Sequence, residues 1–139
     1  MLEIIASLGA GRMGRGIAHA FAYAGHDVLL VDLQPRTSAA FAVLARDALA
    51  EIDQSLLALS SLGVFADALR EQILARVRIV ARDDAQAVLR TADVVFEGAP
   101  EVMEAKRAAF EAMTPLVRAN AIVASTTSTM LVTQLAELV

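Results

Sequence analysis

Three glycines near the start of the sequence have a spacing that can bind phosphate. Gly9, Gly11 and Gly14 form the pattern Gly-x-Gly-x-x-Gly between an apolar run, residues 4–8, and an alanine-rich segment, residues 17–24. The run is typical of a buried strand and the segment of a helix, the context in which this pattern predicts dinucleotide binding. Glycine permits the sharp turn, the close approach of backbone to a diphosphate, and the close packing of helix on strand. The free N–H groups and positive dipole at the helix start would hold the diphosphate.

Asp32 supplies the second feature expected of such a site. It follows a second predicted strand, residues 27–31, and lies eighteen residues beyond Gly14. A carboxylate at this position can accept hydrogen bonds from both hydroxyls of the adenosine ribose and repels a 2′-phosphate. The sequence therefore favours NAD over NADP as the cofactor. A glycine turn without a ligand, in some other α/β fold, is the alternative interpretation.

Two more polar segments follow predicted strands. Gly98–Glu101 comes after a strand predicted over 92–97, and Ser125–Ser128 comes after one predicted over 121–124. The carboxyl ends of parallel strands meet at the edge of a sheet where α/β folds bind their ligands. We therefore expect both segments to join the glycine turn and Asp32 in one site.

The rest of the pattern predicts a Rossmann-type, doubly wound α/β fold with a mostly parallel sheet. Apolar residues recur at intervals of three and four over residues 36–59, which predicts a long helix, and a second amphipathic helix is predicted over 64–75. This helical pair after the second strand is more than a minimal Rossmann unit needs. The other expected elements are a strand over 77–81 and helices over 84–89, capped by Asp84, over 100–113, starting at Pro100, and over 130–138.

Composition limits the classes of partner. The 139 residues, 57% hydrophobic and 20% charged, are those of a single globular domain, and the net charge of −4 argues against nucleic acid or an anionic membrane as partner. There is no cysteine, and the longest uncharged stretch, residues 119–136, is too polar for a membrane span. Met1–Glu3 leads directly into the first strand, so we expect no signal peptide and a cytoplasmic location. No metal site is predicted.

With these motifs in place, the sequence resembles the N-terminal NAD-binding domain of the L-3-hydroxyacyl-CoA dehydrogenase family. The resemblance is carried by residues 9–18 continuing to Gly25 and Asp32, by residues 92–101 with Lys106, and by residues 124–129. The first stretch is shared with many dehydrogenases, whereas the second and third in this order are more specific. The resemblance implies an NAD-dependent oxidoreductase of fatty acid metabolism that transfers hydride between NAD and C3 of a 3-hydroxyacyl-CoA or a related 3-hydroxy acid.

The resemblance also implies roles for individual residues. Ser128 aligns with the family's active-site serine, which helps to bind the reacting oxygen of the substrate. The residues expected at the cofactor are Gly9, Gly11, Arg12, Met13, Gly14, Asp32, Gly98, Ala99, Glu101, Lys106 and Thr126. Glu101, Lys106 and Ser128 also have structural interpretations, as an acid in a helix first turn, a solvated helix residue and a cap or turn residue.

The sequence departs from the family in ways that limit what this chain does alone. Thr126 stands where the family has asparagine, which alters contacts near the nicotinamide ribose. Oxidation of a secondary alcohol needs a base, and the family's catalytic histidine and its glutamate partner lie beyond Val139. So does the helical domain that binds substrate and forms the homodimer of full-length relatives. We expect the 139-residue chain alone to be inactive, and His19 and His26 to be structural or surface residues.

Three alternatives stay open. Residues 33–75 contain only Arg36, Arg46 and Arg70 as cations, whereas relatives that use CoA hold it with cations in this region. This favours relatives that act on free hydroxy acids, such as carnitine or gulonate dehydrogenases. The 6-phosphogluconate or 3-hydroxyisobutyrate dehydrogenase group shares the Gly-x-Gly-x-Met-Gly turn. The third alternative is a non-catalytic NAD(H)-binding module.

Overall fold

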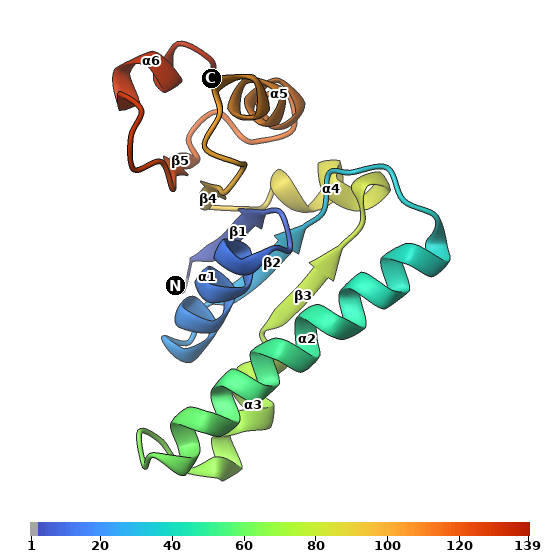
Figure 1. Cartoon of the computed structure of the whole chain (residues 1–139), viewed down its shortest axis with the longest axis vertical. Coiled ribbons are helices and arrows are strands. Elements are labelled where there is room, and N and C mark those ends of the chain that lie inside the picture. Colours follow the sequence, from blue (N-terminus) through green and yellow to red (C-terminus); the bar gives the residue numbers. More distant parts are fainter. Residues whose placement is uncertain (1–2) are drawn as a thin grey trace.

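The apolar runs of the sequence become the strands of one sheet in the computed structural model, which describes residues 3–139. The strands are β1 (Ile4–Leu8), β2 (Asp27–Val31), β3 (Val77–Val80), β4 (Val94–Glu97) and β5 (Ile122–Ser125). Within the described residues the sheet is entirely parallel, in the order β3-β2-β1-β4-β5 (Figure 1). The predicted Rossmann-type fold is confirmed. The prediction of no signal peptide rests partly on Met1 and Leu2, which lie outside the described residues.

Strand β1 lies in the middle of the sheet, and the direction of winding changes there. The chain adds β2 and β3 on one side of β1 and then returns to place β4 and β5 on the other. In register, Leu8 at the end of β1 lies beside Val31 of β2 and Glu97 of β4, so the carboxyl ends are level. Open α/β sheets bind ligands outside these ends, at the point where the winding reverses. The topology therefore places a candidate site beyond the end of β1.

Helices cover both faces of the sheet (Figure 1). One face carries α1 (Arg12–Tyr23), α2 (Ser38–Ser61) and α3 (Arg70–Leu74), the last preceded by the 3₁₀ turn η1 (Asp67–Leu69). The other carries α4 (Ala85–Leu89), preceded by the 3₁₀ turn η2 (Arg82–Asp84), with α5 (Met103–Met113) and α6 (Val132–Ala136). The predicted helical pair after the second strand corresponds to α2 and α3.

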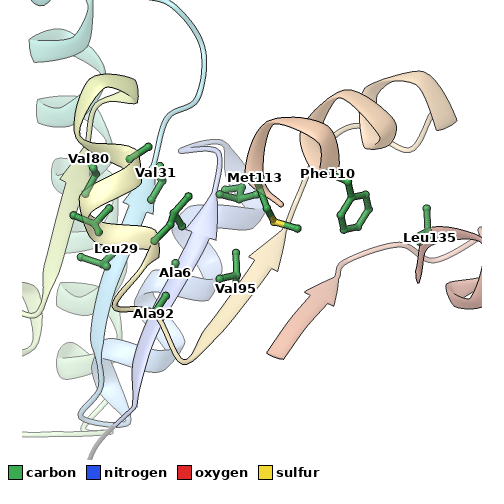
Figure 2. Packing of buried hydrophobic residues seen from close by; sticks show 13 residues of the cluster. Ala6, Leu29, Val31, Val80, Ala92, Val95, Phe110, Met113 and Leu135 are labelled. Carbon is green, nitrogen blue, oxygen red and sulfur yellow. The ribbon is translucent and has the colours of Figure 1, made fainter. Parts of the chain in front are cut away.

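The core consists of two apolar layers, one on each face. Along β2, Val28 and Leu30 pack toward α1, α2 and α3, whereas Leu29 and Val31 pack toward the other three helices. Figure 2 shows Phe110 of α5 and its neighbours gathered on this second face. A strand buried on both faces needs apolar residues at every position, which explains the continuous apolar runs of the sequence. Burial of each large apolar side chain stabilises the fold by about 1.5–3 kcal/mol.

Several helix bounds differ from the sequence predictions. Helix α2 begins at Ser38 rather than at Arg36, because the Thr37 hydroxyl accepts a hydrogen bond from the Ala40 amide at 3.2 Å and caps the helix there. Asp84 precedes α4 as predicted, but its side chain makes no capping hydrogen bond. The helices predicted over 64–75 and 130–138 are shorter in the structure, as α3 and α6.

Helix α5 also begins later than predicted, and this changes the position of an acidic residue. The helix starts at Met103 rather than at Pro100, because Val102 has an extended backbone conformation, with φ −133° and ψ 136°. Glu101 therefore lies in the loop before the helix and not in its first turn. No helix within residues 3–139 is long and apolar enough to cross a membrane.

The turn between β1 and α1 depends on glycine at two positions. Gly9 has φ +94°, in the left-handed region that side chains disfavour, and its N–H donates to the Val31 carbonyl at 2.8 Å. Gly14, in the first turn of α1, lies directly against Gly9. A Cβ atom on Gly14 would be 2.0 Å from the Gly9 carbonyl oxygen and 3.1 Å from Leu30 Cδ2. Only glycine at position 14 lets the helix pack this closely on the sheet.

This contact gives the first prediction. Gly14→Ala should destabilise the protein by about 1–3 kcal/mol or more, because the added methyl group overlaps backbone that cannot move away. Gly16→Ala is the matched control on the same helix, since a Cβ atom there meets nothing within 4 Å. The control should stabilise the protein by about 0.5–1 kcal/mol through helix propensity. Urea unfolding measures both variants, and equal stabilities would contradict the assigned packing of α1.

Candidate functional site

The structure brings the four predicted segments to the carboxyl edge of the sheet. Gly98, which follows β4, lies where three of them meet. A Cβ atom built on it would be 3.5 Å from the Leu8 carbonyl oxygen, 3.8 Å from Met13 Cβ and 4.0 Å from Thr126 Oγ1. The exits of β1, β4 and β5 and the start of α1 therefore meet at this residue.

The start of α1 has the features of an anion site. Gly11 is the N-cap and offers no side chain, and hydrogen bonding within the helix begins with the Arg15 amide, which donates to the Gly11 carbonyl at 3.0 Å. The preceding N–H groups have no partner within the helix. A Cβ atom on Gly11 meets nothing within 4 Å, and the neighbouring Arg12 and Met13 are exposed. This open backbone beside an arginine fits the diphosphate of a dinucleotide.

Asp32 lies at the end of β2, where its carboxylate is almost fully buried. Its N–H donates to the Val80 carbonyl at 2.9 Å, which fixes the backbone against β3. One carboxylate oxygen accepts from the Gln34 amide at 3.3 Å, and the other pairs with Arg36 Nε. A pocket of about 320 Å³ adjoins the carboxylate and is lined by residues that include Pro35, Arg36, Phe41 and Arg82. Asp32 thus faces a cavity, but Arg36 already neutralises its charge.

Lys106, which the resemblance placed along the cofactor, is completely buried on the first half of α5. Its Nζ lies 3.1 and 3.3 Å from the two carboxylate oxygens of Glu97, whose side chain is also completely buried. The same Nζ donates to the Ala99 carbonyl at 3.2 Å and lies 3.3 Å from Glu101 Oε2. The lysine therefore connects β4, its exit loop and α5. It is not the solvated helix residue that was the alternative interpretation.

Glu101 binds the segment that follows β5. Its Oε1 accepts hydrogen bonds from the hydroxyls of Thr127 and Thr129, at 2.6 and 2.8 Å. The same oxygen accepts from the amides of Ser128 and Thr129, both at 2.9 Å. These donors, the Thr127 hydroxyl above all, hold the pKa of Glu101 far below the ordinary carboxyl value of 4.5. Ser128 is thereby fixed through its backbone, while its side chain is exposed at the edge of the sheet.

Both histidines of the sequence lie away from this edge. His19 is on α1, where its Nδ1 lies 3.0 Å from Ser55 Oγ of α2 and burial lowers its pKa. His26 precedes β2 at the opposite end of the sheet, beside Glu3. Their predicted structural roles fit these positions. Among residues 3–139, no three His, Cys, Asp or Glu side chains are grouped so that they could hold a metal ion.

Sequence reasoning missed two residues of the site, Glu97 and Arg36. A charged residue that ends an otherwise apolar strand, nine positions before the single lysine of the chain, was a signal for a buried pair. Arg36 gave a weaker signal. Outside a helix, a spacing of four residues between an acid and an arginine does not fix the distance between their side chains. Only the fold of the Gln34–Arg36 loop brings the guanidinium back onto Asp32.

Parallel strands that end level at a glycine turn, beneath the open start of a helix, define a Rossmann-type dinucleotide-binding domain. Within that class, this chain belongs to the family "3-hydroxyacyl-CoA dehydrogenase, NAD binding domain", whose sequence profile matches residues 4–139. The cofactor of this domain is NAD, as Asp32 predicted. The resemblance found in the sequence is confirmed.

Known proteins agree with this assignment. The chain is 33% identical over 136 residues to a 3-hydroxybutyryl-CoA dehydrogenase of Bradyrhizobium diazoefficiens, covering 98% of this chain and 43% of the relative. It is 31% identical over 132 residues to the enzyme of that name from Clostridioides difficile, covering 95% of this chain and 43% of the relative. The crystal structure of (S)-3-hydroxybutyryl-CoA dehydrogenase from Ralstonia eutropha superposes with a TM-score of 0.84 at 28% identity, over 99% of this chain and 45% of that one. The chain thus spans less than half the length of these relatives.

The environment of Glu101 gives the second prediction. A carboxylate whose folded pKa lies below its unfolded value stabilises the fold above the unfolded pKa and loses this effect as pH falls through the folded one. Wild type should therefore be more stable than Glu101→Gln at pH 7, and the difference should shrink as pH falls below 4.5. Urea unfolding of both proteins between pH 7 and 3 measures this difference. The control is Glu104→Gln, an exposed acid on α5, and a Glu101→Gln difference independent of pH would refute the hydrogen-bonded carboxylate.

Proposed function

We propose that this chain supplies the NAD-binding part of a 3-hydroxyacyl-CoA dehydrogenase-like enzyme, which transfers hydride between NAD and C3 of a 3-hydroxyacyl-CoA. The observation that carries the proposal is the placement of the Ser128 turn at the same sheet edge as the glycine turn, with Glu101 holding its backbone. One carboxyl edge can then present both a cofactor and the oxygen of a substrate. The matched relatives that are named 3-hydroxybutyryl-CoA dehydrogenases support the reaction class.

The chain's own residues divide the work along this edge. Backbone at Gly9, Gly11 and Gly14, with Arg12 and Met13, would hold the diphosphate, and Asp32 the adenosine ribose. The other end of the cofactor site would have a floor formed by Gly98, Ala99 and Thr126. Glu101 and Lys106 would lie beneath this floor. Ser128 would orient the reacting oxygen of the substrate. NAD, when bound, accepts or donates the hydride.

We propose that the proton of the reaction is handled outside these 139 residues. An alcohol oxidation needs a general base within hydrogen-bond reach of the hydroxyl, and both His19 and His26 lie away from the carboxyl edge. In the complete protein, the helical domain of the family would supply the histidine, its glutamate partner, the substrate pocket and the homodimer contact. We place this protein in the cytoplasm, with neither nucleic acid nor a membrane as partner.

One observation favours a second candidate, a dehydrogenase of free 3-hydroxy acids. The three cations between residues 33 and 75 are each paired with a carboxylate. Arg36 contacts Asp32, Arg46 contacts Asp47 at 2.8 Å, and Arg70 contacts Asp53 at 2.6 Å and Asp67 at 3.1 Å. Cations that are already neutralised contribute less to holding the phosphates of CoA. A small free acid has no CoA phosphates, so its binding does not require free cations in this region.

The third prediction tests cofactor binding with the chain itself. NADH fluorescence should rise on titration with the 139-residue protein, and NADPH should bind more weakly because of Asp32. Gly11→Val should lower NADH affinity by about tenfold or more, because an overpacked contact costs about 1–3 kcal/mol. The fold should tolerate this side chain, since a Cβ atom on Gly11 meets open space. Gly16→Ala is the control, and equal NADH affinity in both variants would contradict the assigned diphosphate site.

The fourth prediction concerns the whole protein. Because the chain spans 43% of its curated relatives, the native product should have more than twice the 14.7 kDa of this chain. Intact-mass spectrometry on the product isolated from its source cells measures this. That product should reduce acetoacetyl-CoA with NADH faster than it reduces acetoacetate. The reverse order of rates would select the free-acid enzyme, and a native mass of 14.7 kDa would select the non-catalytic module.

A further inference from the structure

A buried set of charges joins the ends of β4 and β5 beneath the Ser128 turn. We propose that Glu97 is a positioning residue, which fixes the turn of residues 125–129 through Ser125 and Lys106 and so places Ser128 before any ligand binds. The inference assigns Lys106 a role through Glu97 and Glu101 rather than as a direct ligand of the cofactor. It deepens the proposed function, because the turn matters for catalysis only if Ser128 faces a substrate.

The Glu97 carboxylate accepts hydrogen bonds from three different residues. Its Oε1 accepts from the Ala99 amide and, at 3.3 Å, from Lys106 Nζ. Its Oε2 accepts from Ser125 Oγ at 2.6 Å and from Lys106 Nζ at 3.1 Å. The side chain is completely shielded from solvent. The residue thus holds three separate pieces of the edge: the β4 exit loop, the end of β5 and helix α5.

Two chains of contacts lead from Glu97 to the turn. In the first, Ser125 Oγ donates to Glu97 and accepts from the Thr127 amide at 3.2 Å. In the second, Lys106 lies between Glu97 and Glu101, and Glu101 accepts from the amides of Ser128 and Thr129. The amides of three consecutive turn residues, 127–129, are therefore held by groups linked to the Glu97 side chain, directly for Ser125 and through Lys106 for Glu101.

The cost of this arrangement points to positioning rather than to stability. A completely buried ion pair loses the hydration of both ions, and a well-packed apolar pair of similar volume often stabilises a fold as well or better. Elsewhere, the same face of the sheet is packed with apolar residues such as Phe110 and Met113. The single lysine of the chain instead makes directional contacts from α5 to the end of β4 and to the loop that follows it. Such contacts hold a site in a productive geometry before its ligand arrives.

The test uses amide hydrogen exchange of the free 139-residue chain. Glu97→Gln keeps the shape but replaces an accepting oxygen by an NH₂ group, which would face donors from Ser125, Lys106 or Ala99. Exchange at Thr127, Ser128 and Thr129 should accelerate by on the order of tenfold, while sheet amides such as those of β2 keep their rates. The matched control is Glu104→Gln, which changes the same charge on the exposed side of α5.

A second variant separates the two routes and guards against a Glu97→Gln protein that does not fold. Ser125→Ala leaves the Glu97–Lys106 pair intact and removes the hydroxyl that holds the Thr127 amide. It should accelerate exchange at Thr127 more than at Ser128 and Thr129. In both variants, NADH affinity should fall by about threefold to tenfold, because the floor beside Thr126 is no longer fixed.

Two results would overturn the proposal. A uniform acceleration across turn and sheet would show that Glu97 only stabilises the whole fold. An unchanged turn with weakened NADH binding would show that the charges contact the cofactor directly. Failure of the proposed function has a different signature, since either wild type would bind no NADH or the native product would bind NADH without reducing acetoacetyl-CoA. The exchange rates of the turn would still report on Glu97 in that case.

Discussion

The contact between Gly14 and the Gly9 carbonyl is the constraint on which the site depends. With a Cβ atom excluded at 2.0 Å, the first turn of α1 packs against the backbone that leaves β1. This closeness directs the open N–H groups of the helix at the point where the winding of the sheet reverses. The loops that follow β4 and β5 lie beside this start of α1. Gly98 follows the neighbouring strand, and a Cβ atom built on it would lie 3.8 Å from Met13 Cβ of α1 and 4.0 Å from Thr126 Oγ1.

The two ends of the edge are prepared for a ligand in different ways. At the end proposed for adenosine, Asp32 carries an exchangeable partner, because the Arg36 side chain is about one-third exposed. At the end proposed for the substrate, Glu101 accepts from the amides of the Ser128 turn, and the Glu97–Lys106 pair beneath it is shielded from water. A partly exposed ion pair such as the first contributes little to stability, so the proposed ribose hydroxyls would replace Arg36 at modest cost. Opening the second arrangement would leave the turn amides and the buried charges without their partners. This end therefore supplies a rigid surface.

The sequence was informative where function depends on local geometry. The spacing of Gly9, Gly11 and Gly14 and the acid at the end of the second strand follow from backbone rules that act within a few residues, so the turn and the strand ends could be predicted. Glu101 could not be placed correctly, because Pro100 suggested a helix start. The loop before α5 is instead set by contacts with residues 127–129, which lie 26 or more positions away along the chain.

Lys106 shows the same limit more sharply. Helical periodicity and composition describe a lysine on an amphipathic helix, and a resemblance describes one along a cofactor. Neither source of information predicts the environment of this lysine. That environment is decided by Glu97, a buried acid at the end of β4 that lies level with Ser125 on β5. A buried ammonium group is tolerated only when acceptors surround it. Four oxygens, two from Glu97 and one each from Ala99 and Glu101, meet that demand. The same oxygens lie at the end of β4 and on the loop that follows it, so the requirement of one buried charge also fixes the surface above it.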